Sequence, residues 1–137
     1  MAELLRECNS WRSSLRTEAR CTLHSFESGL QAAASAMAAA DVLVTAHGSG
    51  MFNALQMHAG ASLVEVLPVS TNGCPCDQHK GLFASERKLR HYLLRSLDPA
   101  CTNATVRQKL TYNRPVHLPW EVLRSVLDDV MRRPVSC

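Results

Sequence analysis

Residues 40–56 read ADVLVTAHGSGMFNALQ, and residues 60–68 read GASLVEVLP. Each segment holds a continuous apolar run, at 41–46 and at 62–67, and such runs are typical of strands buried on both faces of a parallel sheet. A His-Gly-Ser-Gly turn follows the first run, and the residues after it predict a short helix from Met51 to about His58. Strand, turn, helix and strand in this order predict an α/β fold with a mainly parallel sheet.

The turn after the first predicted strand is suited to an anion. Gly48 and Gly50 would let the backbone approach a ligand closely, while the first N–H groups of the helix point at that ligand. The main-chain groups of Ser49, Met51 and Phe52 would serve as donors. We therefore expect a phosphate or diphosphate as the ligand.

Two polar side chains flank this turn. His47 ends the first strand, at the edge where open α/β sheets bind ligands, and it could donate a hydrogen bond to an anionic oxygen. Glu65 interrupts the second apolar run, where an unpaired carboxylate would be costly, and an acid about 20 positions after a phosphate turn often holds a ribose. A hydrogen-bonded scaffold histidine and a structural ion-pair glutamate are the alternative interpretations.

The two segments together resemble the signature region of glycosyltransferase family 61. In that family His-Gly-Ala-Gly-Leu-Thr-Asn opens a helix, and a Val-Val-Glu-Ile-x-Pro strand follows. The resemblance is carried by residues 37–68, extends to about residue 20, and beyond residue 69 concerns only the order of elements. The positions that match the donor-facing motif are His47, Gly48, Ser49, Gly50 and Asn53, and Glu65 matches its glutamate. Together with Met51, these residues form the predicted donor-binding set.

This resemblance implies a GT-B enzyme whose carboxyl-terminal domain is a Rossmann-like three-layer α/β/α structure. It implies inverting, metal-independent transfer of a sugar from a nucleotide sugar, a UDP-sugar, to a protein or glycan acceptor. No cofactor is implied besides this donor substrate, and no residue of the chain is identified as the general base. The location implied for the full-length parent is the lumen of the Golgi or the endoplasmic reticulum.

The sequence also departs from the family pattern. Ser49 stands where the family has Ala, Met51 where it has Leu, and Phe52 where it has Thr; Gln56 and His58 replace Phe and Pro. Loss of the Thr hydroxyl at Phe52 removes a hydrogen bond that a ligand could use, and the phenyl ring adds bulk. Weaker donor binding is expected from these changes.

Length limits what this chain can do. Its 137 residues suffice for one ordinary core, whereas a GT-B enzyme has two domains with the active site between them. Residues 1–137 are therefore expected to form a single, incomplete carboxyl-terminal domain, with a missing amino-terminal domain or a second copy as its partner. A non-catalytic fragment or interaction module that retains the fold is the alternative function.

The remaining helices and strands are predicted from the spacing of apolar residues and from residues that interrupt helices and strands. Helical periodicity predicts helices at 2–18, 28–39, 85–97 and 119–133. A capping box of Ser28 and Gln31 would begin the second of these helices. A short strand is expected over Arg20–Phe26. Residues 69–82 and 98–118 are expected to form irregular loops, the second with a short strand near Val116.

Charge gives little indication of the ligand. The net charge of +3 does not by itself indicate nucleic acid. The expected helix at 85–97 carries a basic cluster, which is interpreted as a solvated face; alternatively Arg87, Lys88 or Arg90 reaches the donor phosphates. The cluster consists of Arg87, Lys88, Arg90, His91 and Arg95.

The six cysteines do not decide between disulfides and reduced thiols. Cys74 and Cys76 with His79 form half of a metal site, but no second cysteine pair exists, so no metal is predicted. The others are scattered, as in disulfides or in reduced thiols, and a bridge from Cys74 or Cys76 to Cys101 is one possibility. The scattered cysteines are Cys8, Cys21, Cys101 and Cys137.

Features that report location disagree with one another. The sequence contains no apolar segment of ~20 residues, and its amino terminus has no signal-peptide pattern. Taken alone, these two features favour the cytoplasm. The sequon Asn103-Ala104-Thr105 and the number of cysteines favour a lumen.

Two other enzyme classes fit less well. A nicotinamide or flavin oxidoreductase would need a small residue where Asn53 stands. A serine hydrolase elbow would need glycines at the positions of His47 and Met51.

Overall fold

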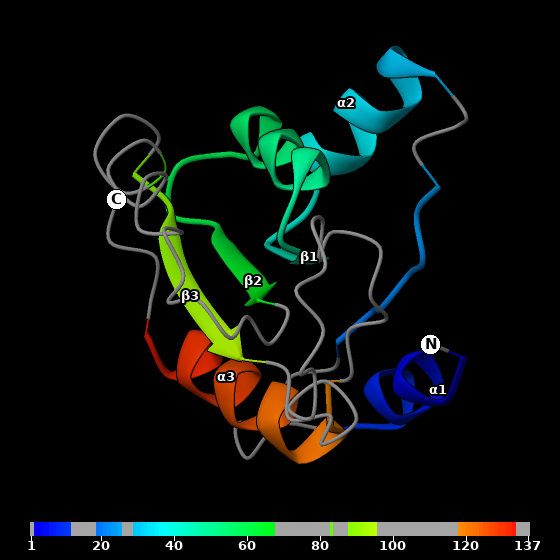
Figure 1. Ribbon diagram of the computed structural model, residues 1–137, viewed down its shortest axis with the longest axis vertical. Coiled ribbons are helices and arrows are strands. Elements are labelled where there is room, and N and C mark those ends of the chain that lie inside the picture. The colour runs from blue at the N-terminus through cyan, green and yellow to red at the C-terminus, as the bar shows by residue number, and fades with distance from the viewer. Residues whose placement is uncertain are drawn as a thin grey trace, which may run out of the picture.

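The fold is α/β, with a three-stranded parallel sheet at its centre (Figure 1). The computed structural model describes residues 2–11, 19–25, 29–67, 83, 88–95 and 118–133. The strands are β1 (Val42–Ala46), β2 (Ser62–Leu67) and β3 (Arg90–Arg95), in the order β1-β2-β3. Both pairings are parallel, which confirms the two predicted strands and their parallel arrangement.

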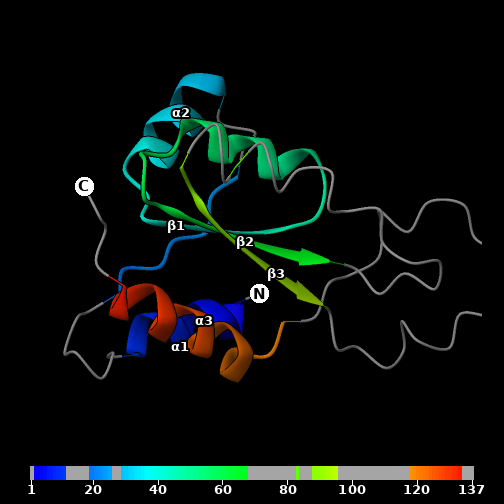
Figure 2. The same cartoon turned by 90° about the vertical axis from the view of Figure 1, so that its left-hand side faces the viewer.

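Helices lie on both sides of this sheet (Figure 2). They are α1 (Ala2–Ser10), α2 (Leu30–Ala38), the 3-10 helix η2 (Ser49–Gln56) and α3 (Trp120–Arg132). The α2 and η2 helices lie on one side, and α1 and α3 lie on the other. The β2 strand is buried along its whole length, as its continuous apolar run predicts.

The face of the sheet toward α2 and η2 holds the largest apolar cluster of the described residues. Leu63 at the centre of β2 has no exposed surface, and Met51 and Ala54 of η2 pack in the same cluster. Phe83 is also fully buried there, although it is distant in sequence from the other members. This cluster therefore fixes η2, and with it the turn after β1, against the sheet.

The opposite face is covered by α3. Val64 of β2 packs against Val126 and Val130 of α3. The rings of Trp11 and Trp120 meet edge to face with their centroids 6.0 Å apart, which connects α3 to the end of α1.

A hydrogen bond between Tyr92 and Asp129 also joins β3 to α3. The Tyr92 hydroxyl donates to Asp129 Oδ2 at 2.9 Å, and Arg133 Nε donates to Asp129 Oδ1 at 3.1 Å. Burial of Tyr92, followed by the hydrogen bond and the charge of Asp129, raises the pKa of Tyr92. The same hydrogen bond, followed by the charge of Arg133, lowers the pKa of Asp129.

Tyr92→Phe should therefore lower the free energy of unfolding by about 1 kcal/mol at neutral pH, because the variant lacks this hydrogen bond. Folding favours the protonated phenol, so the wild-type chain should lose this contribution as the pH rises from the unfolded pKa of 10.0 through the higher folded value. Urea unfolding of both proteins between pH 7 and 11 measures the difference. A difference that stays constant over this range would contradict the assignment.

The predicted helix at 85–97 is wrong, because residues 90–95 form β3. Leucine, lysine and arginine favour helices, but here pairing with β2 overrides that local preference. The basic cluster is therefore not one helix face. Arg90 donates instead to the carbonyl oxygens of Val130 and Arg133 at the end of α3, at 3.4 and 3.1 Å, and to Gly60 O at 3.2 Å.

The first helix and the strand expected after it also differ from prediction. The α1 helix ends at Ser10, and residues 12–18 lie outside the described part of the chain. No strand occurs over the described residues 20–25. The backbone groups of Cys21 bond to a side chain instead of to a strand: Asn9 Oδ1 accepts from Cys21 N, and Asn9 Nδ2 donates to Cys21 O, both at 2.9 Å.

The other helices are confirmed with shifted boundaries. The N-cap of α2 is Gly29 rather than the predicted Ser28, and its φ of 96° is favourable only for glycine. The helix predicted from Met51 begins two residues earlier, at Ser49, and is a 3-10 helix. Pro119 is the N-cap of α3 rather than its first residue.

A disulfide joins Cys8 to Cys21. It confirms the disulfide alternative for this pair and holds α1 against the segment that follows it. Cys8 is buried beside Trp11, Leu123 and Leu127.

Replacing both Cys8 and Cys21 by Ser should lower the free energy of unfolding by about 2 kcal/mol, since the bridge closes a loop of 13 residues and restricts the unfolded chain. Urea unfolding with and without reductant measures this. Reductant should destabilise the wild-type chain and leave the double variant unchanged, and equal responses of the two proteins would contradict a structural role for the bridge.

Several predictions concern positions outside the described residues: the loops at 69–82 and 98–118 apart from Leu118, the strand near Val116, the pairing of Cys74 or Cys76 with Cys101, and the sequon at Asn103. Within the described ranges, none of the helices has the length and apolar character needed to cross a bilayer.

Candidate functional site

The turn after β1 lies at the carboxyl edge of the sheet. The backbone N–H of His47 donates to Val66 O at 2.9 Å, so the end of β1 is held to β2 just before the turn. Gly48 has a φ of 147°, which side chains rarely tolerate. A Cβ at Gly50 would lie 3.3 Å from Thr45 Oγ1. Steric constraints therefore favour glycine at both positions of the predicted turn.

Two other predicted site residues support this turn from within. Met51 is buried in the core, and its N–H donates to Gly48 O at 3.1 Å. Asn53 Nδ2 donates to Gly50 O at 2.8 Å. Ser49 is exposed at the first position of η2, where helical N–H groups have no partner within the helix.

Beside the turn, one buried carboxylate of β2 joins two histidines, His47 directly after β1 and His91 in β3. Glu65 Oε1 bonds to His47 Nδ1, and Glu65 Oε2 bonds to His91 Nε2 at 2.8 Å. The Glu65 side chain has no exposed surface, while the side chains of His91 and His47 are 3% and 14% exposed. We call these three residues the His–Glu–His cluster.

The hydrogen bonds of this cluster restrict where its protons lie. An ionised Glu65 can only accept, so His47 Nδ1 and His91 Nε2 each carry a hydrogen in that state. The remaining ring nitrogen of His91, Nδ1, is buried and has no hydrogen-bond partner among the residues that the structure describes. The carboxylate therefore fixes the orientation of both rings from inside the protein.

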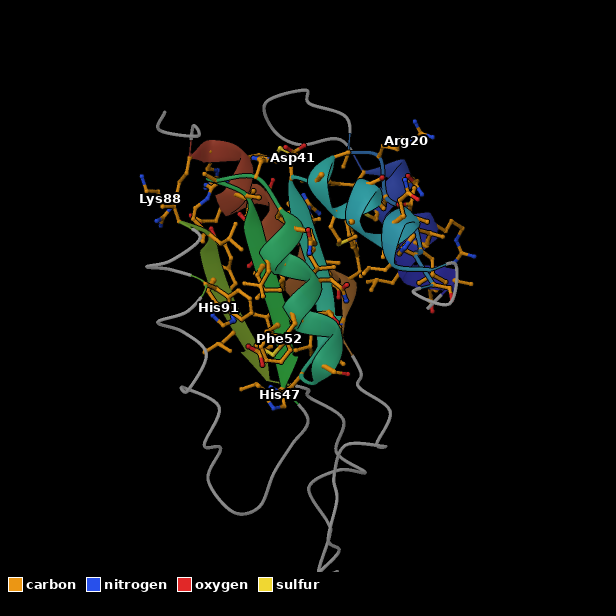
Figure 3. All side chains as sticks on the ribbon, turned by 90° about the horizontal axis from the view of Figure 1, so that it is seen from above. Arg20, Asp41, His47, Phe52, Lys88 and His91 are labelled. Atoms are coloured by element: carbon orange, nitrogen blue, oxygen red, sulfur yellow. A yellow bond between two sulfur atoms is a disulfide. The ribbon has the colours of Figure 1, made fainter. Side chains whose placement is uncertain are left out.

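Aromatic rings enclose the buried side of the cluster. Phe83 meets the His91 ring edge to face at 5.6 Å between centroids, and the Phe52 ring lies 6.3 Å from Phe83. Figure 3 shows His47 at the end of the sheet opposite Asp41, with Phe52 and His91 on the side of η2. Phe52 is 41% exposed, so its ring also forms part of the surface near the turn.

The structure thus brings His47 and Glu65 together, as the sequence predicted for one site. The third member, His91, was missed because it was assigned to a solvated helix face. A signal was present in RHYLLR at 90–95, an apolar centre of strand length between two arginines. Contact of Glu65 with a ribose stays a prediction; the observed contacts of this carboxylate are those of the alternative, a structural partner.

A second histidine–carboxylate pair lies at the other end of β1. His58 Nε2 is 3.2 Å from Asp41 Oδ1, and both side chains are well exposed. Because this pair is remote from the turn, it provides a control for substitutions in the His–Glu–His cluster. Across the described residues, no group of three histidine, cysteine or acidic side chains is arranged to hold a metal ion.

Comparison with known proteins adds no relative: no family model, no curated protein and no solved structure matches this chain.

Proposed function

We propose that the chain is the donor-binding part of a glycosyltransferase and that it binds the diphosphate of a UDP-sugar at the turn after β1. The observation that carries this proposal is the position of a positive-φ glycine turn beside a carboxylate-held histidine at the carboxyl edge of a parallel sheet. Ligands of open α/β sheets bind at this edge. The proposed domain is Rossmann-like, with three α/β/α layers.

Three groups would contact the donor in this proposal. The first N–H groups of η2, from Ser49 and Gly50, would donate to the phosphate oxygens. His47 would add a side-chain donor, and Glu65 with His91 would hold its ring in place. Met51 and Asn53 would shape the turn from inside.

The sequence resemblance supports the finer parts of the proposal. These are inverting, metal-independent transfer, a protein or glycan acceptor, and a parent enzyme in the Golgi or endoplasmic reticulum. The acceptor site and the general base would come from a second domain. The half-exposed Phe52 ring beside the turn favours a second candidate, a module that keeps the fold without transferring sugar.

Isothermal titration of the folded chain with UDP tests the proposal. We expect saturable binding, weakened at least about tenfold by His47→Ala because a hydrogen bond to an anion is lost. Gly48→Ala should also weaken binding, since the φ of 147° strains any side chain. His58→Ala is the matched control and should bind like the wild-type chain.

Two results would contradict donor binding. One is the absence of UDP binding by a chain whose circular dichroism shows that it is folded. The other is saturable binding of NAD in place of UDP, which would favour the oxidoreductase alternative.

A further inference from the structure

Of the large apolar side chains that are exposed in the described part of the chain, one is aromatic and follows the turn after β1. It is Phe52, the fourth residue of η2, which is 41% exposed. The others are Leu23, Leu30 and Val44, which lie in other segments. A single exposed apolar residue is ordinary in a folded protein, so the informative observation is the position of Phe52 relative to the turn.

The 3-10 geometry of η2 places Phe52 on the same helix face as the proposed phosphate donors. Residues three apart eclipse one another in a 3-10 helix, so Phe52 lies directly beyond Ser49 along the axis. At about 2 Å of rise per residue, the two are about 6 Å apart along the helix. Both are exposed, whereas Met51 and Ala54, also three apart, are buried in the core. The exposed face that begins at Ser49 therefore continues to the Phe52 ring.

The core supports the Phe52 ring from the inside of the protein. Phe83 has no exposed surface, its ring centroid lies 6.3 Å from that of Phe52, and the two ring planes are tilted by 44°. Phe83 in turn meets the His91 ring edge to face. Aromatic pairs at such separations attract one another, so the Phe52 ring is positioned before a ligand arrives. A side chain that is already ordered loses little conformational entropy on binding.

We infer that Phe52 stacks on the uracil ring of the donor while the turn holds the diphosphate. The inference rests on the proposed function and names the part of the donor that the exposed ring recognises. In a nucleoside diphosphate one ribose joins the base to the phosphates, so the base lies beyond them by a distance comparable to the helix turn that separates Phe52 from Ser49. Every base has a π-face, and aromatic side chains stack on it.

The face of η2 beyond the turn suits a planar base better than a sugar. After Ser49 its residues are Phe52 and the half-buried Leu55, and both are apolar. The hydroxyl groups of a sugar would lose hydrogen bonds with water against such a face, which is costly. The flat face of a base gains from the same contact, since stacking on an aromatic ring is favourable. The Phe52 ring is therefore assigned to the base and not to the transferred sugar.

Titration of the folded chain with two ligands tests this assignment. UDP contains the diphosphate and the base, whereas inorganic pyrophosphate contains the diphosphate alone. Phe52→Ala should weaken UDP binding about tenfold through loss of one base–aromatic stack, and should change pyrophosphate binding by less than about twofold. The variant should remain folded, because truncation of a partly exposed ring has a small effect on stability.

Three further variants separate the ring from its bulk and from the fold. Phe52→Tyr keeps an aromatic ring and should bind both ligands like the wild-type chain. Phe52→Leu keeps an apolar side chain without a ring and should resemble Phe52→Ala. His58→Ala alters the pair at the other end of β1, so it is the matched control and should leave both affinities unchanged.

Proton NMR of the bound ligand gives an independent measurement. The H5 and H6 resonances of uracil should move upfield in the complex with the wild-type chain, because the ring current of a stacked phenyl group shields them. Phe52→Leu should remove this shift, whereas Phe52→Tyr should retain it. A purely structural role of Phe52 would not produce this difference between the two variants.

The outcomes separate the assignment of Phe52 from the proposed function. Equal weakening of UDP and pyrophosphate by Phe52→Ala would mean that the ring supports the turn, and would overturn the inference. A loss seen with a UDP-sugar but not with UDP would place the ring against the sugar and would also overturn it. Equal affinity of the wild-type chain for pyrophosphate and UDP would overturn it too and leave a diphosphate site standing. Binding of neither ligand by the folded wild-type chain would overturn the proposed function, and the inference with it.

Discussion

Phe83→Ala is expected to lower the free energy of unfolding by about 4 kcal/mol. Phe83 has no exposed surface and lies in the cluster that joins η2 to the sheet. Truncation to alanine removes most of a large buried ring and leaves a cavity that the surrounding strands cannot close. It also removes the edge-to-face contact with His91, so the imidazole loses the ring that packs against it.

Urea unfolding monitored by circular dichroism measures this loss, and Phe52→Ala is the matched control. The two rings lie 6.3 Å apart, but Phe52 is 41% exposed, so its truncation should cost less than about 1 kcal/mol. Similar losses for the two variants would mean that Phe83 is not packed in the core as described.

Glu65→Ala is expected to lower the free energy of unfolding by about 3 kcal/mol, through a cavity and through unsatisfied histidines. The carboxylate has no exposed surface, and both of its oxygens accept hydrogen bonds from imidazoles. Without it, His91 Nε2 loses its acceptor in a buried position where its Nδ1 already has no partner in the described part of the chain. The loss should therefore exceed that of an ordinary surface substitution several-fold.

Glu65→Gln is the control for this substitution, since it keeps the volume and can bond to both rings. It should cost about 1 kcal/mol in the same urea experiment. If the alanine and glutamine variants were equally stable, neither the volume of the side chain nor its hydrogen bonds to the two histidines would stabilise the fold.

The sequence predicted the part of the fold where local pattern and tertiary environment agree. The β1 and β2 strands are β-branched apolar runs, and in β2 this composition fits burial on both faces. The same burial was predicted for β1 but is wrong there, because β1 lies at the edge of the described sheet and Val44 is 38% exposed. For residues 90–95, leucine and arginine fit a helix as well as a strand, and only pairing with β2 decides between them. A single sequence does not contain that information, since the partner strand lies more than 20 residues away.

The absence of pairing information in a single sequence also explains which residues of the candidate site could be predicted. His47 and Glu65 could be selected because each interrupts or ends an apolar strand, where a polar side chain needs a partner. Their direct bond could be anticipated only as an alternative, because strand register is not visible in the sequence. His91 was missed together with β3, since its inward direction follows from strand alternation and not from its neighbours in the chain.

The strand order also bears on how the site is assembled. Partners in the β1–β2 pairing are closer in sequence than partners in the β2–β3 pairing, so we expect the β1–β2 pairing to form first. The first pairing brings His47 to Glu65, whereas His91 joins only when β3 docks. An intermediate that contains only β1 and β2 would hold the carboxylate with one of its two histidines. The imidazole resonances of His91 would therefore report the last step of sheet assembly.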